Sequence, residues 1–387
     1  MVSGATFADL DGDGWQDLIL ACQWGPVRVF MNQRGHLQEA TDRLGLGDYV
    51  GWWNGVTVAD FDGDGRLDIA ASNWGLNGGS LGYERPALLA GVASQEVAGV
   101  PLVFWGEFGG AIGMGVIEAE YDAALGKVVP IRPKPALERG FPAIAGRFST
   151  FAAYNSASVA DLLGNDFASA TRLSAPWLAS TVFMQRNGKF EPVILPPEVQ
   201  FSPSFGICAA DFDGDGREDL FLAQNFFQVQ PEAVRCDAGR SVLLRGDGHG
   251  NFTGLSGQES GLLIYGEQRG AATADYDHDG RVDLVVTQNG AATRLFHNVR
   301  ARPGLRVRLV GPPGNPSGVG AVIRLRYGDR WGPAREVHAG AGYWSQDSAV
   351  QVLGTPEPPT AVWVRWPGGK IQQTPVSPGA QEIAVER

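Results

Sequence analysis

The stretch FADLDGDGWQDLILACQWG, Phe7 to Gly25, decides the fold. It places four aspartates within nine residues, directly before an apolar run. The same pattern, Asp-x-Asp-Gly-Asp-Gly-x-x-Asp, returns at Asp60–Asp68 and Asp211–Asp219. A fourth copy at Asp275–Asp283 carries His in place of one Gly. Copies of one length, each followed by a short apolar segment, indicate a repeat architecture built from strands.

The clustered carboxylates predict a bound cation. Like charges this close repel one another unless a cation neutralises them, and oxygen ligands at alternating positions suit Ca²⁺. We expect the four Asp side chains and the seventh backbone carbonyl of each copy to bind about four calcium ions. The sixth residue, Gly, allows the sharp bend with a positive φ. The predicted ligands are Asp9, Asp11, Asp13, Trp15, Asp17, Asp60, Asp62, Asp64, Arg66, Asp68, Asp211, Asp213, Asp215, Arg217, Asp219, Asp275, Asp277, Asp279, Arg281 and Asp283.

Two other interpretations compete with this one. An EF-hand needs Glu at its twelfth position and a flanking helix, but the twelfth positions here are Leu20, Ala71, Leu222 and Val286. Asp-Gly pairs also form ordinary hairpin turns, which remains an alternative for any single copy. Four complete copies favour calcium.

Composition supports an all-β protein without a nucleic-acid partner. The 387 residues include 54 Gly and 24 Pro, which is typical of many short strands joined by turns. The net charge of −11 argues against nucleic acid and belongs largely to the acidic loops. No apolar run is long enough for a membrane span, and no signal peptide is visible. Calcium loops nevertheless predict a secreted, periplasmic or cell-surface location, so we expect an upstream leader to be missing from this sequence.

The spacing of the copies predicts a β-propeller. The gap between the second and third copies fits about three repeats, so degenerate, metal-free copies are expected from Glu107 and Asp161. Units of this length, each with about four strands, are typical of propeller blades. We therefore expect six or seven blades over residues 1–300. The alternating apolar pattern after the linker Arg300–Gly304 predicts a small β-sandwich or barrel over residues 305–387.

The residues also carry a family resemblance. The acidic loops, their strands and their spacing resemble the FG-GAP/VCBS repeats of integrin-type propellers. The stretches GLRVRLVGPPGNPSGVGAVIRLRYGD and REVHAGAGYWSQDSAVQVLG resemble the ASPIC/UnbV domain, which follows such propellers in cartilage acidic protein and bacterial relatives. The resemblance implies secretion, calcium binding and adhesion-type recognition, but it implies no particular chemistry.

Strand order places a candidate ligand site opposite the calcium loops. In an antiparallel blade, loops between first and second strands share one face, and the segments after the second strands share the other. Amides, aromatic rings and one Arg gather there, a set that suits a glycan or protein ligand. Packing between blades is the alternative for each residue. The predicted ligand residues are Trp24, Trp52, Trp53, Asn54, Asn73, Trp74, Asn225, Phe226, Arg269 and Asn289.

An enzyme is the second hypothesis, and a purely structural module is the third. A propeller lyase or isomerase acting on a carbohydrate or small molecule would use the same cleft, with Glu267 and Arg269, or Glu107, as acid–base candidates. It requires a deep pocket with several titratable groups, whereas a binding protein requires a shallow aromatic surface. The stretch Gly342–Gln346 is expected to be core with one exposed ring. The sequence leaves the oligomeric state open.

Overall fold

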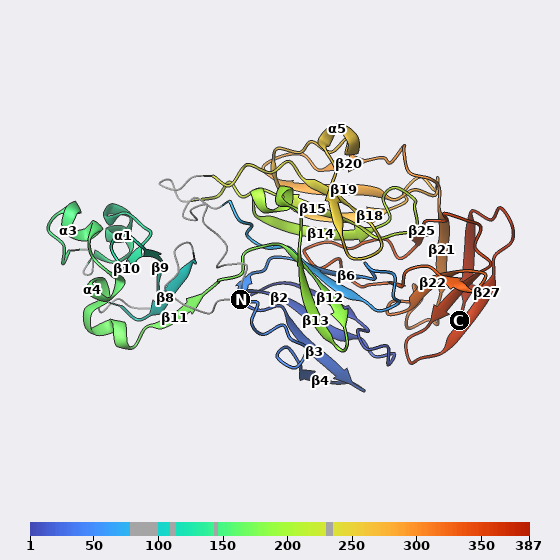
Figure 1. Cartoon of the computed structure of the whole chain (residues 1–387), viewed down its shortest axis with the longest axis horizontal. Helices are drawn as coiled ribbons and strands as arrows, with labels where there is room; N and C mark the ends of the chain where they lie inside the picture. Colours follow the sequence, from blue (N-terminus) through green and yellow to red (C-terminus); the bar gives the residue numbers. More distant parts are fainter. Residues whose placement is uncertain (78–99, 109–113, 143–145, 230–234) are drawn as a thin grey trace.

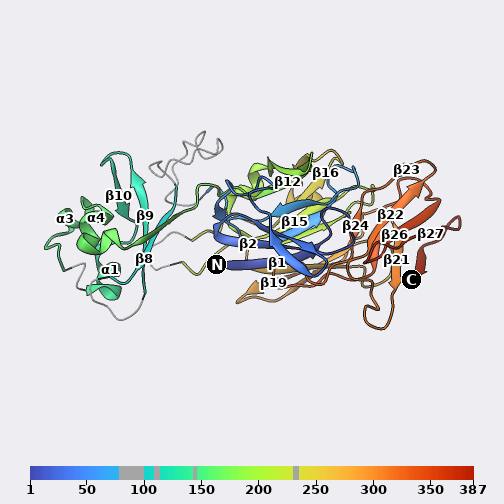
Figure 2. The same ribbon diagram turned by 90° about the horizontal axis from the view of Figure 1, so that it is seen from below.

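The computed structural model describes residues 1–77, 100–108, 114–142, 146–229 and 235–387. The molecule is elongated, with an array of antiparallel sheets between two smaller units (Figures 1 and 2). A subdomain built from residues 100–175 lies at one end, and the C-terminal β domain lies at the other. No helix in the described residues is long and apolar enough to cross a membrane.

Four sheets of the central array follow the repeat. In each sheet an acidic loop joins the first two strands, as predicted. The second strand forms directly after the loop because its residues are largely apolar β-formers. The sheets are β1 (Val2–Ala8), β2 (Asp17–Gly25), β3 (Arg28–Gln33) and β4 (His36–Glu39), with β5 (Gly51–Trp52) on β2; β6 (Val56–Ala59), β7 (Asp68–Ala71), β12 (Thr181–Arg186) and β13 (Lys189–Ile194); β14 (Ser204–Ala210), β15 (Asp219–Gln224), β16 (Val242–Gly246) and β17 (Phe252–Gly254); β18 (Glu267–Ala274), β19 (Asp283–Asn289) and β20 (Arg294–Phe296).

The sheets are arranged as blades around a common axis. The innermost strands lie next to one another in the order β1, β6, β14 and β18. Buried side chains fill the spaces between neighbouring blades, for example Ile19 with Ile69 and Phe183, and Val182 with Ile207 and Leu222. The all-β class is confirmed, with a propeller followed by a small β domain.

The prediction of two degenerate repeat copies, starting at Glu107 and Asp161, is wrong. Residues 100–175 are an insertion between β7 and β12 of the second blade, which explains the long gap between acidic loops. Asp161 lies in helix α4 (Val159–Leu163), because Ser158 and Asp161 form a reciprocal capping box that starts a helix. Glu107 follows β8 (Leu102–Gly106), and residues 109–113 of the expected copy lie outside the described residues. The described residues therefore build four repeat blades, fewer than the six or seven expected.

The inserted subdomain has its own small core. A four-stranded sheet packs against short helices through Phe104, Ile117, Tyr154 and Leu162. Its remaining elements are β9 (Gly115–Asp122), β10 (Lys127–Pro130), α1 (Lys134–Gly140), α3 (Phe151–Asn155), the 3₁₀ helix η1 (Gly164–Ala168) and β11 (Thr171–Ser174). In the central array, the short 3₁₀ helix η2 (Pro197–Phe201) lies in the connection between the second and third blades, and α5 (Gly257–Ser260) lies in the connection between the third and fourth.

The C-terminal domain is a sandwich of two sheets, as predicted. Val307, Ile323, Val364 and Trp366 are buried in the core between them. One sheet holds β21 (Leu305–Val310), β25 (Gln351–Leu353) and β28 (Glu382–Glu386); the other holds β22 (Val322–Tyr327), β23 (Arg330–Trp331), β24 (Arg335–Glu336), β26 (Ala361–Arg365) and β27 (Ile371–Pro375).

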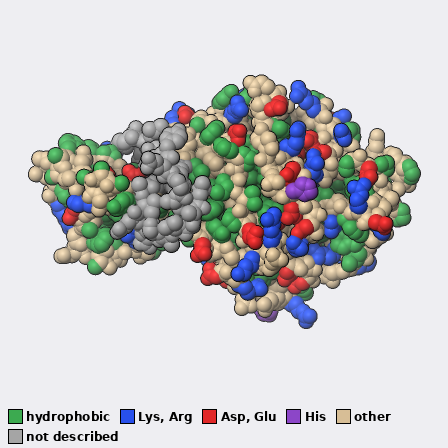
Figure 3. All heavy atoms as spheres, viewed as in Figure 1, with side chains coloured by type: hydrophobic (Ala, Val, Ile, Leu, Met, Phe, Trp, Pro, Cys, Tyr) green, Lys and Arg blue, Asp and Glu red, His purple; other side chains and the backbone are tan. Residues whose placement is uncertain are grey.

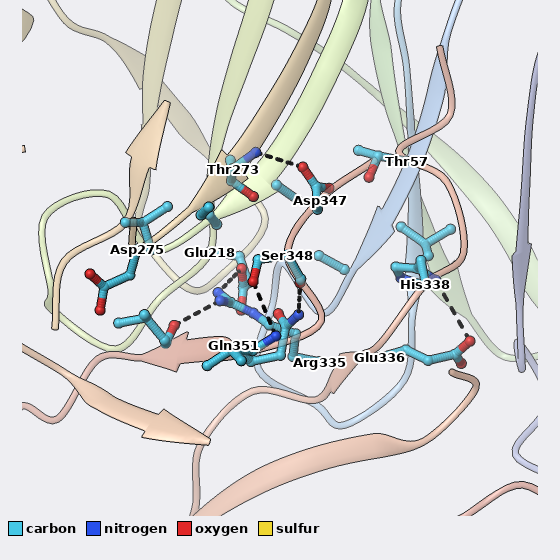
Figure 4. Close-up of a pocket in the computed structure, with 18 residues that line it drawn as sticks. Thr57, Glu218, Thr273, Asp275, Arg335, Glu336, His338, Asp347, Ser348 and Gln351 are labelled. Atoms are coloured by element: carbon cyan, nitrogen blue, oxygen red, sulfur yellow. Dashed lines mark hydrogen bonds and ion pairs between the residues drawn. The ribbon is translucent and has the colours of Figure 1, made fainter. Parts of the chain in front are cut away.

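One segment of this domain enters the propeller. Residues 338–350, here called the axial segment, run between the innermost strands of the blades. Figure 4 shows Asp347 of this segment between Thr57 of β6 and Thr273 of β18, with His338 on the side of Thr57. The Thr273 N–H donates to Asp347 Oδ1 (2.7 Å), and His338 Nδ1 lies 3.0 Å from the carbonyl oxygen of Phe7 in β1. The segment therefore ties the first blade to the fourth.

Candidate functional site

The four acidic loops share one hydrogen-bond pattern. In each loop the sixth N–H donates to the first carboxylate, and the seventh N–H donates to the fifth. In the first loop these bonds join Gly14 to Asp9 (2.9 Å) and Trp15 to Asp13 (2.8 Å). The equivalent pairs are Gly65–Asp60, Arg66–Asp64, Gly216–Asp211, Arg217–Asp215, Gly280–Asp275 and Arg281–Asp279. The sixth glycines have φ between 82° and 91°, as predicted, and His278 takes a positive φ of 66° where the other loops have Gly.

The ninth aspartate of each loop fastens the loop to its blade. In the second loop, Asp68 Oδ2 accepts from the Phe61 N–H (3.0 Å) and Oδ1 accepts from the Gln185 N–H of β12 (2.7 Å). Asp17, Asp219 and Asp283 accept from the corresponding two N–H groups. These carboxylates are therefore structural clamps in addition to candidate ligands.

The loops fit a divalent cation. In the second loop, oxygens of Asp60, Asp62 and Asp68 lie within 4.8 Å of one another. The buried Asp60 Oδ1 has no hydrogen-bond partner among the described residues, so a cation would satisfy it. The loop's four carboxylates, set against the guanidinium groups of Arg66 and Arg324, leave two negative charges, which one Ca²⁺ would balance.

Burial makes these carboxylates costly without a cation. Desolvation raises the pKa of Asp68 to about 8 and that of Asp17 to about 7, although backbone N–H groups oppose the shift. Both side chains nevertheless accept hydrogen bonds at both oxygens, as ionised carboxylates do. Asp213 and Asp219 lie together with Asp211 in the third loop, as do Asp277 and Asp283 with Asp275 in the fourth. A bound divalent ion would favour the ionised form at each loop.

The C-terminal domain covers the acidic-loop face, and each loop meets one of its arginines. Arg365 Nη2 lies 3.0 Å from Asp9 Oδ2, and Arg306 pairs with Asp275. The charges of Arg324 and Arg335 act on Asp60 and Asp211. These four arginines were not among the site residues predicted from the sequence. The sequence signal that could have revealed them is an arginine within otherwise apolar strand segments such as VIRLRY and VWVRW.

The opposite face carries a continuous line of aromatic rings, here called the aromatic row. Trp52 stacks on Trp74 with centroids 4.3 Å apart and planes at 16°, and Trp24 lies 5.1 Å from Trp52. Phe226 continues the row 5.3 Å from Trp74. The row then passes through Phe205, Tyr343 and Trp344. In Figure 3, hydrophobic side chains gather at the end of the propeller that faces away from the C-terminal domain.

The structure divides nine of the ten predicted ligand residues into two groups. Trp24, Trp52, Trp74 and Phe226 are partly exposed in the row, and Asn289 is exposed at the end of β19. Trp53, Asn54, Asn73 and Asn225 are at most 1% exposed and hold the backbone: Asn73 Nδ2 donates to Trp177 O, and Asn225 Nδ2 donates to Gly239 O. These four residues therefore fit the alternative interpretation, in which the side chains pack between blades.

Arg269 is held inside the row and does not form an acid–base pair at an open cleft. Its guanidinium lies 4.1 Å from the centroid of Phe205 and pairs with Glu267, which is 3% exposed and also accepts from the Phe227 N–H. Glu107, the other acid–base candidate, is exposed in the inserted subdomain, where it is not part of the row. A cation against ring faces and a buried carboxylate rigidifies the row.

The axis of the propeller is nearly filled. A cavity of about 40 Å³ remains where the axial segment passes Glu218, Arg335, His338 and Asp347 (Figure 4). This volume holds one or two water molecules and no sugar. The aromatic row is therefore a partly exposed surface, and the axial cavity is too small to be the central cleft that the enzyme hypothesis predicted.

Comparison with known proteins agrees with the two-part architecture. The family model described as FG-GAP-like repeat matches residues 9–71, and the model described as ASPIC and UnbV matches residues 311–387. No curated protein matches the chain. A solved structure of the exotype rhamnogalacturonan lyase YesX aligns over 99% of this chain and 72% of its own, at 12% identity and a TM-score of 0.25, too low to establish a shared fold. The chain therefore carries an FG-GAP-like repeat near its N-terminus and an ASPIC and UnbV domain at its C-terminus.

Proposed function

We propose that this chain is a calcium-binding extracellular protein that binds a glycan at the aromatic row. The observation that carries the proposal is the row itself, with partly exposed Trp24, Trp52 and Trp74 in direct ring contact. Aromatic faces stack on the apolar faces of sugar rings, and neighbouring amides bind hydroxyl groups. Calcium at the acidic loops would hold the blades that carry the row.

The neighbouring polar groups support a glycan over a protein ligand. Asn77, Gln228 and Asn289 are exposed amides at or beyond the ends of β7, β15 and β19, so each lies beside the face that carries the row. The charged pair of the row, Arg269 and Glu267, is already satisfied internally. A surface that combines stacked rings with uncharged hydrogen-bonding groups is complementary to a sugar.

The proposal is tested by retention on a panel of immobilised glycans in calcium buffer. We expect the wild-type chain to bind and Trp52→Ala to lose binding, because Trp52 contacts both Trp24 and Trp74. Trp331→Ala is the matched control, since Trp331 is 40% exposed but lies in β23 of the C-terminal domain. Equal binding by the wild type and Trp52→Ala would refute the proposed site.

A further inference from the structure

The axial segment carries two aromatic residues from the C-terminal domain to the opposite face of the propeller. It starts beside the acidic-loop face, where Arg335 and Glu336 of β24 lie, and reaches the row at Tyr343. Tyr343 is 8% exposed, and its ring centroid lies 5.7 Å from that of Phe205 in β14. The two domains therefore contribute rings to one surface.

Close packing fixes the position of this segment. A Cβ on Gly342 would lie 1.5 Å from the carbonyl oxygen of Val56 in β6, so only glycine fits there. The Ser348 N–H donates to the carbonyl oxygen of Thr273 (2.9 Å), and the Ala341 N–H donates to that of Ser345 (2.8 Å). The turn that carries Tyr343 and Trp344 is thus held at both ends.

Trp344 at the tip of the turn is exposed at a structural cost. It is 81% exposed, its ring is nearly parallel to that of Tyr343 (6°), and the two centroids lie 5.5 Å apart. Its φ of 47° is left-handed, which is unfavourable for a bulky residue. Such strain at a large exposed ring is typical of binding sites. Trp24, at the other end of the row, also has a left-handed φ, of 60°.

We propose that Tyr343 and Trp344 complete the aromatic row, so that an oligosaccharide bound by the propeller also contacts the C-terminal domain. This inference rests on the proposed function and specifies its ligand as a chain of several sugar units. Trp24, Trp74 and Phe226 belong to the first, second and third blades, and Trp344 comes from the C-terminal domain. One sugar ring covers part of such a row, whereas an oligosaccharide follows its length.

The experiment measures how the affinity of the wild type and of variants in the row depends on oligosaccharide length. The full chain in calcium buffer is titrated calorimetrically with disaccharides and longer oligomers of the cello-, xylo- and manno- series. We expect Trp344→Ala to weaken binding of the longer oligomers about tenfold while disaccharide affinity is kept. Trp52→Ala should weaken both, and Trp331→Ala should weaken neither. Because the Trp344 side chain is exposed, the melting temperature of Trp344→Ala should equal that of the wild type.

The outcomes separate this inference from the proposed function. If Trp52→Ala loses binding while Trp344→Ala matches the wild type at every length, the C-terminal contribution is refuted and the propeller site stands. If the wild-type chain binds none of these oligomers, both proposals fail for this ligand class. Sedimentation of the wild type with phosphatidylcholine–phosphatidylglycerol vesicles, without sugar binding, would also refute both, since it would assign the exposed rings to a membrane surface.

Discussion

Loss of the buried ion pair between the propeller and the C-terminal domain should strongly destabilise the protein. Arg335 of β24 donates to Glu218 through Nε (3.1 Å) and Nη2 (2.5 Å), and its Nη1 donates to the carbonyl oxygen of Val352 (2.9 Å). Arg335 is 8% exposed and Glu218 is 2% exposed. Arg335→Met would keep the apolar stem but leave a buried carboxylate without its partner. Removing one partner of a buried pair costs about 3–5 kcal/mol.

The measurement is urea unfolding of the full chain, with a double-mutant cycle and a surface control. Arg335→Met combined with Glu218→Gln should recover much of the lost stability, because no uncompensated charge remains buried. Arg330→Met is the control: its pair with Glu357 is largely exposed, with side-chain exposures of 75% and 41%, and exposed pairs contribute only about 0–1 kcal/mol. Equal effects of Arg335→Met and Arg330→Met would refute the docking of the C-terminal domain on the acidic-loop face.

The remaining predictions concern the loops, the axial segment and the core. Chelation of calcium should lower the melting temperature, since a free calcium concentration of about 100 times the Kd stabilises the native state by about 2.7 kcal/mol per site. Asp62→Asn should lower the calcium content, measured by elemental analysis, by one ion per chain. An unchanged calcium content would contradict the assignment of Asp62 as a ligand. Gly342→Ala should lower the melting temperature far more than Gly340→Ala, because both glycines have a positive φ but only Gly342 lacks space for a Cβ. Equal decreases in melting temperature would disprove the close packing of the axial segment against β6. Trp53→Ala should cost about 3–5 kcal/mol in urea, because Trp53 is fully buried, and a stable variant that fails only in glycan binding would show that Trp53 is a ligand residue after all.

Local patterns predicted the repeat blades because their causes lie within a few residues. The spacing of Asp and Gly sets the turn of each acidic loop, and the following β-formers set the second strand. The same reasoning placed Trp24, Trp52 and Trp74 on the face opposite the loops, since strand order alone determines the faces of a blade. What the pattern could not separate was exposure from burial: Trp52 and Trp53 are neighbours, yet only Trp52 lies in the row.

The incorrect predictions have two causes: the long gap between the second and third acidic loops was ambiguous, and contacts between distant segments leave no local sequence pattern. A gap of about three repeats can hold three blades or one insertion, and the spacing does not distinguish them. The capping box at Ser158 and Asp161 was the local signal for a helix there. The path of the axial segment has no local signal, because it depends on a fit between Gly342 and Val56 that only the folded domains create.

The axial segment gives the C-terminal domain a role that two separate domains could not have. Its base adjoins β24, whose Arg335 acts on Asp211 of the third loop, and its tip places Tyr343 against Phe205 in the aromatic row. Between these ends it bonds to β1 and β18, the first and last of the innermost strands. The proposed glycan would therefore favour the seated position of this segment, and by linkage a change at the acidic-loop face that shifts this position would change the affinity for the glycan by the same factor.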